Sequence, residues 1–248
     1  MTAIKSVLNI VSCENRKIYG QQKYKIMLIV TAAIIAGGAL IGLIPGSFLG
    51  LTMANYPFTA LSLINYIIAP LAVFMLAADL LAGEIAGSEI KVLLTRPVSR
   101  ISVLLAKAVS IAGYAGLLLA EGLIISGLLS ISLSGFLSFS VSAMLWSYLV
   151  GFVPVLTLVA MSVMIASMLK SGTSCFSFCL LAYAGFTVFG LVFSTLSPAL
   201  FTSYLGIGSM VIGSAVPVAS LLTGIGILAG YALLFLSAGS LKFSSREF

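Results

Sequence analysis

Few residues in this chain could carry out chemistry, and histidine does not occur. Histidine-based metal sites, catalytic triads and proton shuttles are therefore excluded. A nucleotide site would need a glycine-rich loop that ends in Gly-Lys-Ser/Thr. The sequence contains no Gly-Lys pair, and KSGT at 170–173 has the wrong order. Any nucleotide hydrolysis must therefore take place in another protein chain.

Sulfur atoms are the second candidate for chemistry. Cys175 and Cys179 are four residues apart, which places them on one face of a helix, and three methionines form a stripe nearby: Met161, Met164 and Met168. Soft sulfur ligands suit Cu(I), but methionine and cysteine are also common packing residues in helices. We expect no metal site. The only other cysteine is Cys13, and this odd number argues against structural disulfides.

One carboxylate lies deep within an apolar stretch. Glu121 follows Lys107 by 14 residues, or roughly 20 Å along a helix. A carboxylate in lipid is costly and by default suggests a function, such as binding a cationic substrate or accepting a proton. The alternative is a protonated or hydrogen-bonded glutamate with a structural role. The sequence leaves both interpretations open.

The composition predicts an all-α integral membrane protein. The 248 residues are 61% hydrophobic and 7% charged, with a mean hydropathy of +1.25, whereas soluble domains carry about 25% charged residues. A membrane-spanning helix needs roughly 20 mostly apolar residues. Six segments of a single transmembrane domain, residues 1–248, meet this requirement: 26–44, 57–82, 103–130, 143–169, 175–196 and 217–241. Pro70 and Pro154 lie inside the second and fourth spans, where we expect kinks.

The basic residues predict the orientation. All twelve Lys and Arg fall on one side of the six-span arrangement, whereas the opposite loops, 45–56, 131–142 and 197–216, carry no charge. Because cytoplasmic loops are enriched in basic residues, we expect both termini to be cytoplasmic. The net charge of +6 reflects this asymmetry and does not indicate nucleic-acid binding. We expect a multi-pass protein of the cell (plasma or inner) membrane of a prokaryote.

The first 25 residues predict a helix that lies in the cytoplasmic membrane interface. Four apolar residues recur at helical spacing, Ile4, Val7, Leu8 and Val11, and polar residues alternate with them: Lys5, Asn9, Ser12 and Arg16. Such a helix buries its apolar face among lipids and leaves its basic groups among the headgroups.

A charged island interrupts the apolar sequence at residues 79–100, DLLAGEIAGSEIKVLLTRPVSR. Together with Lys107, it holds seven of the eighteen charged residues. The stretch GEIAGSEIKVLL predicts a short helix that ends before Pro97, with its acids early and its lysine late, as the helix dipole favours. We expect Arg100 and Lys107 to anchor the start of the third span to lipid headgroups.

The pattern of this island resembles the permease subunits of ABC-2-type transporters. It consists of an acid at the end of the second span, then GE, a small pair, E-x-x-x-LL, RPVSR and a lysine seven residues later. It is most similar to the branch with sodium-, bacitracin- and copper-related (NosY-like) export permeases. That family also has six spans, cytoplasmic termini, an N-terminal interfacial helix and an apolar outer segment between spans five and six. One departure is Gly87-Ser88, where the family usually has Gly-Thr.

The resemblance implies that the island is a coupling helix, which docks into a groove of a separate cytoplasmic ATPase. The residues that would make this contact are Glu84, Ser88, Glu89, Lys91, Arg96, Pro97 and Arg100. The resemblance further implies two copies of the ATPase, which would bind ATP and Mg²⁺, and a second permease chain, identical or paralogous. The small residues Gly38 and Gly42 are spaced for close helix packing.

Two other functions remain as alternatives. A stand-alone secondary transporter usually shows internal repeats and polar sites at the membrane midplane, and no convincing repeat is present here. A membrane enzyme acting on lipid would need clustered acids, for which Asp79, Glu84 and Glu89 are the candidates. Co-purification with an ATPase would distinguish the first interpretation from these two.

Overall fold

The computed structural model describes residues 2–42, 55–87, 99–134, 140–211 and 217–245, and within these ranges it contains helices and no strand. Six helical stretches are long and apolar enough to cross a membrane, which confirms the expected number. A further helix, α1 Thr2–Gly20, precedes them. The six stretches are α2 Gln22–Gly42, the second span Tyr56–Ala86, α7 Arg100–Ser134, α8 Val141–Met168, α9 Gly172–Val192 and α10 Val218–Ser244.

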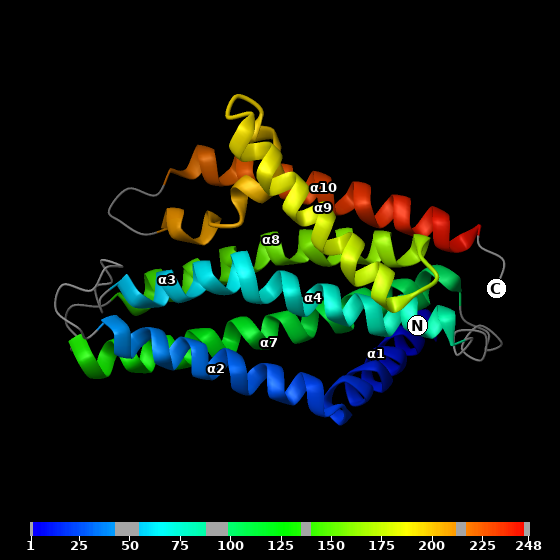
Figure 1. Ribbon diagram of the computed structural model, residues 1–248, viewed down its shortest axis with the longest axis horizontal. Coiled ribbons are helices and arrows are strands. Elements are labelled where there is room, and N and C mark those ends of the chain that lie inside the picture. The colour runs from blue at the N-terminus through cyan, green and yellow to red at the C-terminus, as the bar shows by residue number, and fades with distance from the viewer. Residues whose placement is uncertain (1, 43–54, 88–98, 135–139, 212–216, 246–248) are drawn as a thin grey trace.

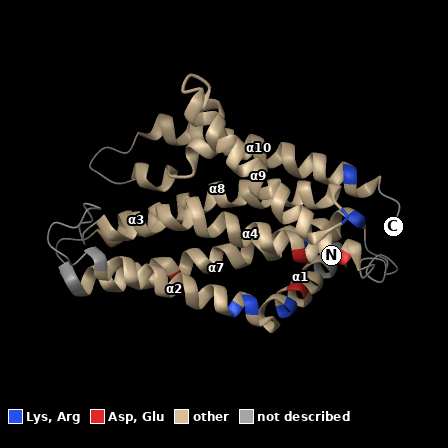
Figure 2. Cartoon of the chain, viewed as in Figure 1, with Lys and Arg blue, Asp and Glu red and all other residues tan. Residues whose placement is uncertain are grey.

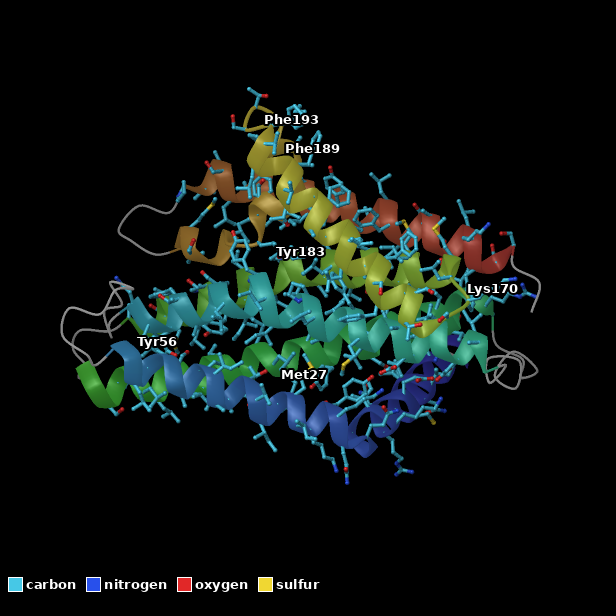
Figure 3. The ribbon with its side chains drawn as sticks, viewed as in Figure 1. Met27, Tyr56, Lys170, Tyr183, Phe189 and Phe193 are labelled. Carbon is cyan, nitrogen blue, oxygen red and sulfur yellow. The ribbon has the colours of Figure 1, made fainter. Side chains whose placement is uncertain are left out.

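The helices run back and forth between two ends that differ in charge. Both chain termini lie at one end (Figure 1), and the Lys and Arg positions, blue in Figure 2, gather toward that end. We call it the charged end. Figure 3 places Lys170 at this end and Tyr56 near the opposite one. The arrangement brings the described basic segments together on one side, as the sequence predicts.

The second span is one continuous helical path made of five pieces: α3 Tyr56–Leu63, η2 Ile64–Ile68, α4 Ala69–Ala77, η3 Ala78–Gly83 and α5 Glu84–Ala86. The two η pieces are π-helical turns. Pro70 has no N–H to offer the carbonyl of Tyr66, four residues earlier. The hydroxyl of Tyr183 on α9 donates to that carbonyl at 2.9 Å. A neighbouring span therefore satisfies the backbone group that the proline leaves unpaired.

Helix α8 lies at the centre of the bundle and continues through Pro154. It packs closely on α10, where a Cβ added to Gly239 would lie 3.1 Å from the Cα of Met164. In their most apolar stretches, 61% of the residues of α7 and α8 are buried, against 11% in α9 and α10. Helices α9 and α10 therefore present broad apolar faces to their surroundings.

The segment between α9 and α10 folds back onto the bundle at the uncharged end. It contains three short 3₁₀ helices: η5 Ser197–Ala199, η6 Phe201–Tyr204 and η7 Ile207–Val211. Phe201 is fully buried, and its ring centroid lies 5.2 Å from that of Phe186 and 5.5 Å from that of Tyr231. We call residues 193–211 the outer segment. Aromatic packing fixes it against both neighbouring spans.

A buried amide ties the outer segment to two spans. Asn65, in the first π-helical turn, donates from Nδ2 to the carbonyls of Gly151 on α8, at 3.0 Å, and of Leu205, at 3.1 Å. Gly208 then packs directly against α8, because an added Cβ would meet the carbonyl oxygen of Ser147 at 2.5 Å. The absence of a side chain at Gly208 is what permits this close approach.

Candidate functional site

Four charged side chains from three elements meet at the charged end. Lys107 on α7 donates to Oε1 of Glu14 on α1 at 3.0 Å and to Oε2 of Glu84 on α5 at 2.6 Å. Lys17, one turn after Glu14, donates to the other oxygen of Glu84 at 2.8 Å. We call Glu14, Lys17, Glu84 and Lys107 the ionic network. It joins α1, the end of the second span and the start of α7.

Most of the ionic network is buried. The exposed fraction of the side chain is 0% for Lys107, 1% for Glu14 and 9% for Glu84, whereas it is 46% for Lys17. Removing a charge from water costs several kcal/mol, so a buried ammonium group needs close carboxylate partners. Lys107 has two such partners. The four charges sum to zero, which makes the arrangement self-compensating.

A second polar cluster lies next to the ionic network. Both Lys23 and Tyr24, in the first turn of α2, donate to Oδ2 of Asp79 in η3. The hydroxyl of Tyr114 on α7 donates to the backbone carbonyl of Tyr24 at 2.9 Å, and the two tyrosine rings pack edge to face at 5.7 Å. We call Lys23, Tyr24, Asp79 and Tyr114 the tyrosine cluster. It holds the start of α2 against the part of the second span that lies near the charged end.

Arg100 connects two helix ends that lie at the charged end. Its Nη1 donates to the backbone carbonyl of Ser244, the last residue of α10, at 3.0 Å. Helix C-termini have unpaired carbonyls and partial negative charge, which favour a cationic partner. Arg100 therefore joins the start of α7 to the end of α10.

Comparison with known proteins assigns the chain to a family. Residues 10–188 match the family model described as "ABC-2 family transporter protein", and this range contains the ionic network, the tyrosine cluster, the first four spans and most of the fifth. The chain is an ABC-2 family protein. No individual curated protein matches it. ABC-2 proteins of this kind are the membrane components of ABC transporters, so the ATPase that drives this permease resides in a partner subunit.

The structure describes two of the seven residues predicted to contact the ATPase. Glu84 belongs to the ionic network and Arg100 contacts Ser244. The other five, Ser88, Glu89, Lys91, Arg96 and Pro97, lie outside the described residues. The coupling role of these residues stays a prediction. Because both oxygens of Glu84 are engaged inside the permease, its carboxylate faces α1 and α7.

One expectation about the permease is wrong. Lys107 does not reach lipid headgroups, because its side chain is completely buried between Glu14 and Glu84. Helix α1 folds over this part of α7 and supplies the carboxylate that makes burial tolerable. Arg100, seven residues earlier, is exposed.

The N-terminal helix of the permease packs on the bundle with one side, and its position in the membrane interface stays a prediction. Residues Thr2–Gly20 are helical, as predicted. The side of α1 that packs on the bundle includes Glu14 and Ile18, both 1% exposed, whereas Leu8 is 60% exposed. The sequence carries no clear signal for the burial of Glu14, because its partner Lys107 lies 93 residues later.

Glu121 lies inside α7 and is half-buried. Its Oε2 is buried and has no hydrogen-bond partner among the described residues. Both interpretations of this carboxylate, a substrate or proton site and a structural group, remain predictions. Cys175 and Cys179 are buried in α9, and the part of the permease that the structure describes contains no cluster of three or more histidine, cysteine or acidic side chains that could hold a metal ion.

Proposed function

We propose that this chain is the permease subunit of an ATP-driven exporter, in which it forms the translocation path together with a second permease chain. The observation that carries the proposal is the ABC-2 family match over residues 10–188, on a chain with six candidate spans. Export, as opposed to import, rests on the resemblance of the island at 79–100 to export permeases. The cargo is not specified by any residue in the described structure.

The charged end supports a cytoplasmic contact with the ATPase. We call residues 84–95 the docking segment. Its sequence combines both signs of charge with the apolar residues Val92, Leu93 and Leu94, a composition that suits a protein interface with a buried apolar centre and a polar rim. The segment starts at Glu84, which two lysines hold in place. A docking element that transmits force needs such a fixed base.

The exposed apolar faces of α9 and α10 support a complex with two permease chains. Leu181, Leu191 and Val192 on α9 are between 65% and 78% exposed in the single chain. In the membrane these side chains must contact lipid or another transmembrane helix. We propose that part of this surface faces the second permease chain, identical or paralogous, and that two ATPase subunits bind the pair.

The test is to purify the tagged chain from its native membrane in mild detergent and to determine the mass of the intact complex. We expect two permease chains and two ATPase subunits. A stand-alone secondary transporter would contain no ATPase and would move cargo without ATP. A complex that lacks an ATPase, or that contains a single permease chain, would contradict the proposal.

The docking segment predicts a second result in the same preparation. Glu89→Lys is expected to weaken ATPase association by about tenfold or more, because truncating a charge at a protein interface costs about 2–5 kcal/mol. The matched control is Lys25→Glu, an equally large charge change at an exposed site of α2. Full association of the Glu89→Lys variant would show that the segment is a solvated loop.

The charge asymmetry predicts the accessibility of single cysteines in whole cells. In a Cys13→Ser background, a cysteine at the exposed Ser203 is expected to react with a membrane-impermeant thiol reagent, and one at the exposed Ser245 is not. The two remaining native cysteines are buried and should not react with the reagent. Labelling at position 245 without labelling at 203 would reverse the proposed orientation.

A further inference from the structure

We infer that Lys107 is a positioning residue for coupling: it holds Glu84 against α1 and α7, so that the N-terminal helix α1 moves together with the docking segment. This inference rests on the proposed function, because it concerns how a movement imposed by the ATPase spreads through the permease. It assigns to α1 a role in transmission in addition to its contact with the membrane.

The first step of the argument is the position of Glu84. It follows directly after η3 and is where the docking segment leaves the second span. One of its oxygens accepts from Lys107 at 2.6 Å and the other from Lys17 at 2.8 Å. Because both oxygens are occupied by different helices, Glu84 cannot shift toward one of them without weakening its bond to the other.

The second step concerns the contacts that the second span makes on both sides of the bend between α1 and α2. Helix α1 ends at Gly20 and α2 begins at Gln22. Before the bend, the ionic network binds α1 to Glu84; after it, Lys23 and Tyr24 bind α2 to Asp79. Asp79 lies in a π-helical turn, a local irregularity that often marks a functional site. The helices on the two sides of the bend therefore hold the second span near the charged end at two points five residues apart, Asp79 and Glu84.

The third step is the energetics of a buried cation shared by two carboxylates. Lys107 is inaccessible to solvent, and Glu14 and Glu84 are its partners. Moving Glu84 away would leave Lys107 with one carboxylate in a site that is closed to solvent, a state that is strongly unfavourable. The lower-energy path is for α1, α5 and the start of α7 to move as one unit.

A buried ionic network is not the best way to obtain stability alone. Apolar residues of similar volume are often equally stabilising or better, and the attested use of buried charges is to select one arrangement of elements. The network at the charged end therefore suits an element whose arrangement matters during transport. This difference also provides the means to separate a structural role from a coupling role.

Cys13 offers a probe for the test, because it is exposed on α1 while Cys175 and Cys179 are buried. An environment-sensitive maleimide dye on Cys13 of the assembled complex, in liposomes, reports the surroundings of α1. A non-hydrolysable ATP analogue is then added. In the wild-type complex we expect the emission of the dye to shift on nucleotide binding.

The decisive variant is Lys107→Met combined with Glu84→Met, which replaces the central ion pair by apolar side chains and leaves Glu14 and Lys17 as a pair at 3.8 Å. We expect it to assemble with the ATPase and to hydrolyse ATP, because both oxygens of Glu84 face α1 and α7 inside the permease, but to lose the shift at Cys13. If this variant does not assemble, Glu84→Gln, which keeps the shape of the side chain and leaves Lys107 paired with Glu14, replaces it with the same expectation. Lys25→Met, at an exposed site, is the control that keeps the shift.

The outcomes separate this inference from the proposed function. A wild-type chain that does not bind an ATPase contradicts the proposed function itself. A wild-type complex that binds and hydrolyses ATP without any change at Cys13 overturns only the inference about α1. A full shift in an assembled Lys107→Met, Glu84→Met variant, or in Glu84→Gln where that replaces it, also overturns it, because α1 would then follow the ATPase without the ionic network.

Discussion

Lys107→Met alone is expected to remove most of the folded permease from the membrane. The substitution leaves the carboxylates of Glu14 and Glu84 close together in a site where both are at least 90% buried, with the partly exposed Lys17 as their remaining cation in the ionic network. Removing one partner of a buried ionic group costs about 3–5 kcal/mol, a large share of the 5–15 kcal/mol that typically stabilises a folded protein. The measurement is the amount of monodisperse protein extracted in mild detergent.

The control for this prediction is Lys25→Met, which removes the same charge from an exposed position of α2. It should leave the extracted amount unchanged within a factor of about two, because surface substitutions usually change stability by less than 0.5 kcal/mol. Equal yields of the Lys107→Met and Lys25→Met variants would mean that the buried network contributes nothing to folding.

Gly208→Ala is expected to destabilise the permease by about 1–3 kcal/mol, the usual cost of forcing an extra methyl group into a packed site. The new Cβ would lie 2.5 Å from the carbonyl oxygen of Ser147 and 2.7 Å from Cδ2 of Leu61. A leucine side chain can rotate, but the backbone of α8 cannot move without disturbing its neighbours. The outer segment must therefore shift away from the bundle, which strains the bond from Asn65 to Leu205.

A matched glycine is available on α10. A Cβ added to Gly226 would meet nothing within 4 Å, and alanine is a better helix former than glycine. Gly226→Ala should therefore melt at the same temperature as the wild type or higher, whereas Gly208→Ala should melt lower. The measurement is the melting temperature of each variant in detergent, compared with that of the wild type. Identical melting of both variants would show that the outer segment is not packed as closely as described.

The main features of the fold could be predicted because the bilayer requires them. A span needs about 20 apolar residues, and hydropathy therefore locates six helices without knowledge of how they pack. The π-helical turns in the second span have no such signal. Pro70 indicates a break, but the group that pairs with the freed carbonyl of Tyr66, the Tyr183 hydroxyl, lies 117 residues after Tyr66 in the sequence. Which neighbour satisfies a free carbonyl depends on tertiary packing.

The candidate site was predictable only in part for the same reason. The charged island stands out in the sequence because its surroundings are apolar, and this located Glu84. Lys107 looks like any lysine at the start of a span, where the side chain normally reaches the headgroups. A lysine at this position is buried, and does not reach the headgroups, when another element of the fold covers it. Glu14, 93 residues earlier, provides that cover.

The distance in sequence between Glu14 and Lys107 has a consequence for biosynthesis. Lys107 follows Glu14 by 93 residues, which at about 5–20 residues per second corresponds to about 5–20 seconds of translation. During that interval the N-terminal helix carries a carboxylate whose buried partner has not yet been made. Until then Lys17 and Glu84 are the members of the ionic network that can already pair, and Glu14 lacks its buried cation. The ribosome has to deliver the third span before the nascent chain can complete the ionic network at its charged end.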